Sequence, residues 1–460
     1  MSTSSVQPDT IAAIATPPGE GGIAVIRLSG PQSWDAVRQL CRLPADAGPG
    51  RVYFRRLREP ATGETLDEGL VLLFRTPRSY TGEDAAELQI HGSPVVARRI
   101  LSALFVFGVR QAEPGEFTRR AFLNDKLNLT QAEAVLDLIH ARSEQAARLA
   151  TAQLANVLGQ RLQDFYARLA ALVADTEAML DFPDDELPQS VPAELAARLQ
   201  TLLADLRHLL ATAPAGHRFR EGARVVLVGC PNAGKSTLLN RLAGRDRAIV
   251  SPTPGTTRDT IEETILFHGI PLTLVDTAGL RDAPSAIEQE GVRRARTEID
   301  QADLLLLLLD ASAPLSADEQ HLLAAVPPDR TLLLLNKTDL GHAKRPADLP
   351  DAFPAAIELS LLADPDLSPL EGRLLDRLLP PTAREAESPV AISLRHEQVL
   401  RRAVAAIEAA LPCLEAAAED QILPAAMSLR EAIEAIGQLL GRNTPEDLLD
   451  QMFSRFCVGK

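Results

Sequence analysis

The 460-residue sequence predicts a multidomain α/β protein. A doubly wound domain with a mostly parallel sheet is inserted in an all-helical domain, and a smaller α/β domain precedes both. Three observations predict this: short apolar runs alternate with turns over residues 1–120, helical periodicity covers residues 130–211 and resumes at 393, and buried-strand runs alternate with helices between them. The expected domains are 1–122, 123–213 (the first segment of the helical domain), 214–379 and 380–460 (its second segment).

In the first domain, the apolar runs Ile23–Leu28, Leu70–Phe74 and Ala86–Ile90 predict strands separated by Gly- and Pro-bearing turns. Thr130 and Glu133 then stand at the spacing of a capping box, which predicts a helix start.

The apolar residues that follow predict one or two long helices ending near residues 181–183, and a second helical stretch over Ala193–Ala211. Residues 214–222 are expected to be a linker.

Residues 229–236 form a complete phosphate-binding loop between the apolar run Val225–Val228 and the predicted helix Thr237–Leu242. Backbone N–H groups would bind the β-phosphate, Lys235 would add a positive charge, and Ser236 would offer a hydroxyl to Mg²⁺. The expected nucleotide contacts here are Asn232, Ala233, Gly234, Lys235, Ser236 and Thr237.

Residues 336–339, Asn-Lys-Thr-Asp, follow the apolar run Leu332–Leu335 and are expected at the carboxyl edge of the sheet. The carboxylate of Asp339 can accept two hydrogen bonds from guanine, whereas adenine lacks the exocyclic amine that donates one of them. The alkyl stem of Lys337 is expected along the purine face. Guanine contacts are therefore predicted at Asn336, Lys337, Thr338 and Asp339.

Two motifs between these complete the set. Asp276 follows Leu272–Val275 and is expected to hold Mg²⁺ through water, while the Gly279 amide would respond to the γ-phosphate. Thr257 is the expected second hydroxyl on Mg²⁺. The ordered motifs predict a P-loop GTPase domain, with further nucleotide contacts at Thr256, Thr257, Asp276, Thr277, Ala278 and Gly279.

Leu280 stands where many regulatory GTPases carry a Gln that orients the attacking water. A leucine can neither donate nor accept a hydrogen bond, so other groups must organise the water and neutralise charge in the transition state. Charged residues nearby are Arg281, Glu288, Glu290, Arg293 and Arg294, most of them expected on the solvated face of a helix.

Composition narrows the class further. The net charge of −15 favours solubility and disfavours indiscriminate binding to nucleic-acid phosphates. No apolar run reaches membrane-spanning length, and the N-terminus lacks a signal pattern. The four cysteines, at positions 41, 230, 413 and 457, form no C-x-x-C pair, which argues against a disulfide framework or a zinc site. A cytoplasmic protein is expected.

Several stretches outside the GTPase motifs are more specific to one family than the phosphate-binding loop, which many GTPases share. They are residues 15–19 (ATPPG), 80–84 (YTGED), 114–118 (PGEFT), 120–126 (RAFLNDK), 181–183 (DFP) and 456–460 (FCVGK). On these, the chain resembles the MnmE (TrmE) family of tRNA-modification GTPases along its whole length.

The resemblance implies a cytoplasmic homodimer that forms a heterotetramer with an FAD-dependent partner, MnmG. Together they would add an aminomethyl or carboxymethylaminomethyl group to carbon 5 of the wobble uridine (U34) of certain tRNAs. GTP is hydrolysed, and a tetrahydrofolate derivative, 5-formyl- or 5,10-methylene-, carries the one-carbon unit. The N-terminal domain is the folate-binding and dimerisation domain of the family.

The resemblance also implies residue roles. K⁺ would replace an arginine finger, and Glu288 would position the attacking water through a second water. The implied K⁺ ligands come from Asn232, Ser251, Thr253 and Thr256, of which Ser251 also contacts the nucleotide. The implied folate contacts are Arg27, Glu87, Lys126 and Lys460, and Cys457 is either a reactive thiol or part of a docking tail.

The chain departs from the family pattern in three places. Val458 replaces a more usual Ile, and Pro252 and Pro254 stiffen the K⁺ loop while keeping its carbonyls. Residues 360–362, Ser-Leu-Leu, stand where a Ser-Ala step touches the guanine carbonyl, so weaker nucleotide binding than the family norm is expected.

Two alternatives stay open from sequence. A ribosome-assembly or translational GTPase switch would explain the GTPase motifs but not the N-terminal stretches or the tail. A folate-dependent aminomethyl transferase with a vestigial nucleotide site is opposed by the intact set Lys235, Ser236, Asp276, Asn336 and Asp339.

Overall fold

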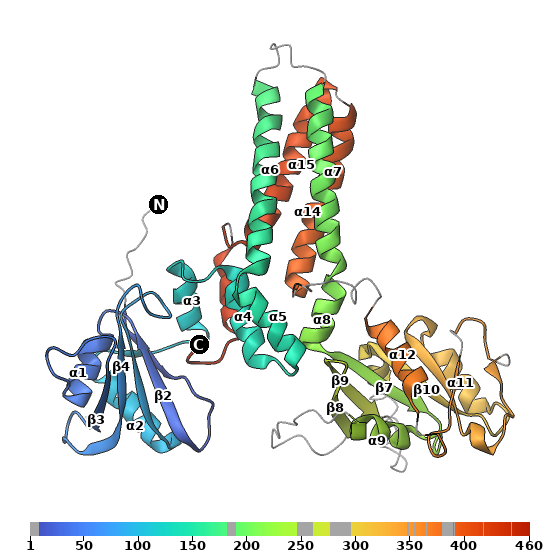
Figure 1. The fold of residues 1–460 in the computed structure, drawn as a ribbon, viewed down its shortest axis with the longest axis horizontal. Coiled ribbons are helices and arrows are strands. Elements are labelled where there is room, and N and C mark those ends of the chain that lie inside the picture. Colours follow the sequence, from blue (N-terminus) through green and yellow to red (C-terminus); the bar gives the residue numbers. More distant parts are fainter. Residues whose placement is uncertain are drawn as a thin grey trace. The chain divides into compact units, whose positions relative to one another are not determined.

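The computed structural model describes residues 9–181, 190–245, 261–276, 296–346, 349–353, 356–364, 366–379, 390, 392–416, 418–442 and 444–460 (Figure 1). The chain forms two compact units. Unit 1 comprises Met1–Leu136, Leu154–Ala171 and Arg430–Lys460, and unit 2 comprises Asp137–Gln153 and Leu172–Leu429.

Unit 1 contains a six-stranded sheet with the order β3-β4-β5-β2-β1-β6. Every neighbouring pair is antiparallel except β1 with β6. The predicted strand runs lie within β2, β4 and β5, which confirms them. The strands are β1 (Ile11–Ile14), β2 (Gly21–Ser29), β3 (Val52–Arg58), β4 (Thr65–Phe74), β5 (Ala85–Gly92) and β6 (Arg110–Gln111).

Helices α1 (Ser33–Cys41) and α2 (Pro94–Phe105) cover one face of this sheet. Leu28, Leu40 and Ile100 share one buried apolar cluster there. Because side chains alternate along a strand, Val25, Arg27 and Ser29 of β2 point to the opposite face. Arg27 is paired in register with Glu87 of β5 on that face.

The helical region begins with α4 (Leu129–His140), α5 (Glu144–Leu154) and α6 (Val157–Asp181). The prediction of one or two helices was therefore wrong. Asn156, at φ 67°, separates α5 from α6 in a left-handed conformation that ends a helix.

The predicted capping box was wrong as well. Asn128 Oδ1 accepts from the backbone N–H of Gln131 at 2.9 Å, and Gln131 Oε1 accepts from the backbone N–H of Asn128 at 3.1 Å. The same reciprocal geometry therefore begins two residues earlier than Thr130. Glu133 is instead 7% exposed inside the helix.

The expected linker at 214–222 is mostly a helix, α8 (Ala213–Glu221). Pro214 lies in its first turn, where a missing backbone N–H breaks no helical hydrogen bond. Gly222 follows at φ 81°, and a Cβ there would lie 2.2 Å from Pro271 O. Proline thus starts this segment as a helix, and glycine ends it.

Unit 2 contains a second six-stranded sheet with the order β12-β11-β10-β7-β9-β8, parallel except for β8. Helices α9 (Lys235–Arg245), α11 (Ala317–Ala325) and α12 (Ser368–Leu378) belong to the same region. This confirms the predicted mostly parallel sheet. The strands are β7 (Ala223–Gly229), β8 (Ile261–Phe267), β9 (Ile270–Asp276), β10 (Leu304–Asp310), β11 (Thr331–Asn336) and β12 (Ile357–Glu358).

The helical region of unit 2 brings α7 (Ser190–Ala211) beside α14 (Leu394–Ala416), as Figure 1 shows. Arg207 of α7 pairs with Glu408 of α14 at 2.6 Å. The chain enters and leaves the sheet region at neighbouring points, because a Cβ on Gly216 would lie 3.1 Å from Ile392 N. This proximity agrees with an insertion into the helical domain.

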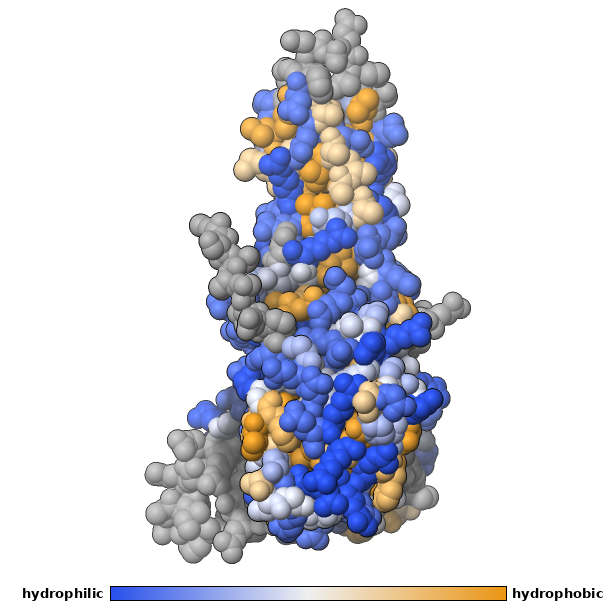
Figure 2. Space-filling view, turned by 90° about the vertical axis from the view of Figure 1, so that its left-hand side faces the viewer, coloured by the Kyte–Doolittle hydropathy of each residue, from blue (hydrophilic) through white to orange (hydrophobic). Residues whose placement is uncertain are grey.

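The remaining helices are α3 (Glu116–Leu123), α15 (Glu419–Leu439) and α16 (Glu446–Phe453). The face drawn in Figure 2 is predominantly hydrophilic, with its hydrophobic residues in separate patches. Within the described ranges, no helix combines the length and apolar character that crossing a membrane requires.

Candidate functional site

The phosphate-binding loop lies between β7 and α9, as predicted. Lys235 is 5% exposed, and its Nζ donates to the carbonyl oxygens of Gly229 at 2.8 Å and Cys230 at 2.9 Å. Gly234 has φ 107°, and a Cβ there would lie 2.3 Å from Asn336 Nδ2. Only glycine therefore allows the base-recognition loop to approach this closely.

Two predicted Mg²⁺ groups lie together beside the loop. Ser236 Oγ donates to Asp276 Oδ2 at 2.9 Å, and Asp276, at the end of β9, is 1% exposed. A hydroxyl and a carboxylate in contact are suitable oxygen donors for Mg²⁺. Among the residues that the structure describes, no cluster of three His, Cys, Asp or Glu side chains could hold a metal.

Asn336 joins the two nucleotide loops. It is 3% exposed, its Nδ2 donates to Ala233 O at 2.8 Å, and its Oδ1 accepts from Leu361 N at 3.0 Å. Ser360 Oγ donates to Asp339 Oδ1 at 2.5 Å. The unusual Ser-Leu-Leu loop thus still lies against the predicted guanine-binding carboxylate.

Lys337 follows Asn336 in the sequence and adopts φ 66°. Its Nζ contacts Asp310 Oδ2 at 2.6 Å. Asp310 was missed by the sequence reasoning. It ends the apolar run of β10 and is paired in register with Asn336, so a search for polar residues at strand ends could have found it.

Some of the predicted site lies outside the described residues. This applies to Ser251, Pro252, Thr253, Pro254, Thr256, Thr257, Thr277, Ala278, Gly279, Leu280, Arg281, Glu288, Glu290, Arg293 and Arg294. Asn232 is described: it is exposed and has φ 61°.

A second site is a cavity of about 100 Å³ in the N-terminal domain. Arg27 and Glu87 line it together with Tyr80 and Phe117. Arg27 Nε donates to Glu87 Oε1 at 2.9 Å, and its guanidinium carbon lies 5.4 Å from the centroid of the Tyr80 ring. Arg27 Nη1 is buried without a hydrogen-bond partner among the described residues, so it can still donate to a ligand.

The C-terminal tail lies close to this cavity. Val458 forms a β-bridge with Pro114, and Gly459, at φ 99°, packs against Ile14, since a Cβ there would lie 2.5 Å from Ile14 O. Burial lowers the pKa of Lys460, and the positive charge of Arg27 lowers it further, whereas Glu87 partly opposes this. Lys460 is therefore a second cation next to the Arg27–Glu87 pair.

The two other predicted residues of this region stand apart from the cavity wall. Lys126 is exposed, its Nζ donates to Pro77 O at 3.0 Å, and it does not belong to the residues that line the cavity. Cys457 is exposed, with its carbonyl near Gly115 N at 3.5 Å. Its role stays a prediction.

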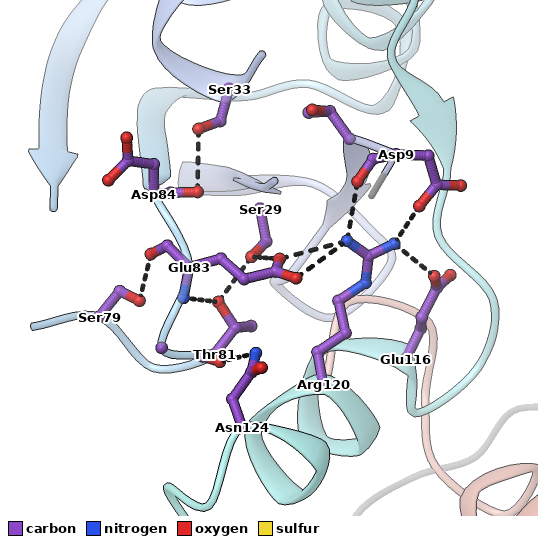
Figure 3. Close-up of polar contacts among 12 residues, drawn as sticks. Asp9, Ser29, Ser33, Ser79, Thr81, Glu83, Asp84, Glu116, Arg120 and Asn124 are labelled. Atoms are coloured by element: carbon purple, nitrogen blue, oxygen red, sulfur yellow. Dashed lines mark hydrogen bonds and ion pairs between the residues drawn. The ribbon is translucent and has the colours of Figure 1, made fainter. Parts of the chain in front are cut away.

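A polar network that is buried at Ser29 and Thr81 and exposed at Asp9 adjoins the cavity (Figure 3). The hydroxyls of Ser29 and Thr81, which line the cavity, are 2.6 Å apart, and Ser29 Oγ donates to Glu83 Oε2 at 2.7 Å. Arg120 contacts that carboxylate at 3.2 Å and Asp9 Oδ1 at 2.6 Å. The network joins the 80–84 and 120–126 stretches, which the sequence marked without revealing their contact.

Two acids of this network, Asp9 and Glu116, have a pKa below the ordinary value. Hydrogen bonds from Arg110, then from Arg120, lower the pKa of Asp9 below its ordinary value despite some burial. Burial alone would raise the pKa of Glu116, but hydrogen bonds from Arg110, Glu113 and Arg120 outweigh it and lower that pKa.

Family models match most of this chain. The family model "GTP-binding protein TrmE N-terminus" matches residues 10–126, and the model "MnmE helical domain" matches residues 129–457. The G domain of the T. maritima FeoB iron transporter is similar at 25% identity over 34% of this chain and 98% of that one, with a TM-score of 0.27.

Curated relatives match over the full length. The tRNA modification GTPase MnmE of Natranaerobius thermophilus is 40% identical over 98% of this chain and 99% of its own. That of Roseiflexus sp. is 43% identical over the same shares. The chain therefore belongs to the MnmE (TrmE) family of tRNA modification GTPases and is a GTP-hydrolysing enzyme.

Proposed function

We propose that this chain is a K⁺-activated GTPase that, with an FAD-dependent MnmG partner, modifies carbon 5 of U34 in certain tRNAs. The group added is aminomethyl or carboxymethylaminomethyl, and a reduced folate supplies its one-carbon unit. The observation that carries the proposal is the full-length similarity to relatives named as tRNA modification GTPases, together with the N-terminal cavity. We also propose that residues 1–122 form the N-terminal domain, 214–379 the GTPase domain, and 123–213 with 380–460 the helical domain.

The cavity suits a folate by its chemistry. A pterin presents an amide and an amine edge to a carboxylate such as Glu87, whose Oε1 receives the bond from Arg27. The buried Arg27 Nη1 can donate to a carbonyl or carboxylate, and the Tyr80 and Phe117 rings can pack against a flat heterocycle. The ammonium of Lys460 would attract the anionic glutamyl tail. Lys126 would reach only a portion of the ligand that extends beyond the cavity.

A homodimer is proposed from the same face of the sheet. Val52, Phe54 and Leu70 are 59%, 61% and 37% exposed, and their register places them on the face that carries Arg27 and Glu87. Exposed apolar residues on an edge strand such as β3 are unfavourable in a monomer. A second copy covering this face would also shield the cavity from water.

For the metal ions, we propose ligands among the residues that carry suitable oxygen atoms. Ser236 and Asp276 would lie around Mg²⁺ with Thr257, and Asn232 would hold K⁺ with the 251–256 loop. Glu288 would position the attacking water. The K⁺ hypothesis is motivated by Leu280, and it predicts much faster hydrolysis in potassium than in sodium. Equal rates in the two salts would remove the cation from the mechanism.

The decisive test of function is nucleoside analysis of tRNA from cells that lack this protein. Loss of the modified wobble uridines, restored by the wild-type gene, is expected. Unchanged wobble uridines would instead favour the ribosome-assembly or translational switch. A Glu288→Ala variant tests the chemistry separately: hydrolysis should slow while GTP binding stays nearly intact.

A further inference from the structure

A buried ion pair lies behind the base-recognition loop, outside the nucleotide motifs. Lys344 Nζ contacts Glu319 Oε1 at 2.7 Å, and the two side chains are only 2% and 6% exposed. Removing both charges from water is costly, and an apolar pair of similar volume is often equally stable. The pair therefore calls for a role other than stability.

The contacts of this pair converge on the last residue of β10. Lys344 Nζ donates to Asp310 O at 2.6 Å, and Asp310 N donates to Glu319 Oε1 at 3.3 Å. The backbone N–H of Lys344 also donates to Ala311 O at 3.2 Å. Both peptide groups of Asp310 are thus fixed from one side by buried charges.

The side chain of Asp310 is fixed as well. Its Oδ1 accepts from Ser312 N at 2.9 Å and Ser312 Oγ at 2.5 Å, which leaves Oδ2 directed to Lys337 Nζ at 2.6 Å. Burial alone would raise the pKa of Asp310, but the hydrogen bonds from Lys337 and Ser312 outweigh it and keep that pKa below its ordinary value. The carboxylate is therefore an ionised anchor with one defined orientation.

Lys337 is the residue that this anchor holds. It adopts φ 66°, a left-handed conformation that a side chain with a Cβ seldom adopts. Its neighbours Asn336 and Asp339 carry the predicted contacts to the loop and to guanine. A lysine stem held at its ammonium end in this conformation offers a fixed apolar surface to a purine ring.

We propose that Glu319, Lys344 and Asp310 form a positioning relay, the base-loop relay, that fixes Lys337 and thereby sets the affinity for guanine nucleotide. The inference rests on the proposed guanine site at residues 336–339 and adds three positioning residues to it. None of the three touches the nucleotide itself. Each acts through the next residue, and the last of them acts through Lys337.

The first test compares Asp310→Ala with the wild type in the full-length protein, using a fluorescent GDP as the probe. The Kd should rise roughly 10-fold, because a charge-assisted hydrogen bond that orders Lys337 is lost. KM for GTP should rise with it, whereas kcat at saturating GTP should stay within about 2-fold of wild type. A purely structural role would lower the melting temperature without this split.

A double-mutant cycle asks whether Asp310 acts through Lys337. Lys337→Met alone should weaken GDP binding, and adding Asp310→Ala to it should change the Kd little further. Additive effects would overturn the relay. If Lys337→Met binds GDP like the wild type, the proposed guanine loop itself is wrong. If Lys337→Met binds weakly while Asp310→Ala binds normally, only the relay fails.

The buried pair is tested by the double variant Glu319→Gln with Lys344→Met. Glutamine keeps the capping box of α11, in which Glu319 pairs with Ser316, and methionine keeps the volume of the lysine stem. A folded variant with a Kd raised several-fold is expected. The matched control is Asp318→Asn, exposed on the same helical turn, which should bind GDP normally. A wild-type Kd in the folded double variant would exclude the pair from the relay.

Discussion

The nucleotide site and the N-terminal cavity differ in the hydrogen bonding of their polar groups. In the nucleotide site, Lys235 donates to loop carbonyls, Ser236 donates to Asp276, and Asn336 joins two loops. In the cavity, Arg27 Nη1 is buried with no partner among the described residues, and Lys460 adds a cation nearby.

This difference has a consequence for binding. Binding of GTP would require Lys235 to exchange its loop carbonyls for phosphate oxygens, so some of the binding free energy would be spent on rearrangement. A ligand in the cavity can instead satisfy a donor that already lacks a partner, and it gains a bond at little structural cost. The cavity therefore offers a buried charged donor, Arg27 Nη1, beside a carboxylate acceptor, Glu87.

The largest expected effect concerns the base. Asp339→Asn should weaken GTP binding roughly 100-fold, because the amide cannot accept two hydrogen bonds from guanine. It should strengthen binding of xanthosine triphosphate, whose C2 carbonyl accepts from that amide. Titration with both nucleotides measures this. Undiminished GTP affinity would show that guanine is read elsewhere.

A smaller loss is expected at the cavity. Arg27→Met should weaken binding of 5-formyltetrahydrofolate roughly 10- to 100-fold, because it removes a buried charged donor. Calorimetric titration measures this effect. Arg99→Met is the matched control, since Arg99 is 46% exposed on α2, which covers the opposite face of the sheet, and pairs with Glu64. Equal folate affinity in both variants would show that Arg27 does not bind the ligand.

Folate affinity in the cavity should also depend on pH. Burial and Arg27 lower the pKa of Lys460, so its positive charge is lost as pH rises through that lowered value, earlier than for an ordinary lysine. Folate affinity should fall several-fold across this window, and Lys460→Met should flatten the profile. A profile that stays unchanged in Lys460→Met would exclude this charge from binding.

The smallest effect is at the start of α4. Asn128→Ala should cost about 1 kcal/mol of unfolding free energy, because the cap of α4 is lost, whereas Asn128→Asp keeps the cap but loses the hydrogen bond from Asn128 Nδ2 to Asn156. Ala132 of α4 packs with Phe453 and Phe456 of the tail, so any functional loss should appear in folate binding and spare GTP binding. Denaturant unfolding with both ligands tests this.

The sequence predicted what local patterns determine. The strand before the phosphate loop and the apolar runs ending at Asp276 and Asn336 follow from buried-strand composition. The helix at 213–221 was missed because Pro214 was interpreted as a break, although proline is favourable in a first turn.

Contacts between distant segments could not be predicted in this way. The bridge from Pro114 to Val458 and the ion pair from Asp310 to Lys337 leave no periodic signal in either segment. Both bring charged residues beside a site.

The most direct test of the account is the wobble-uridine content of tRNA in a strain whose only copy of this gene carries Arg27→Met. With the variant protein folded and present at normal levels, we expect loss of the U34 modification, while an Arg99→Met strain keeps it. Full modification in the Arg27→Met strain would show that the N-terminal cavity does not bind the folate that supplies the one-carbon unit.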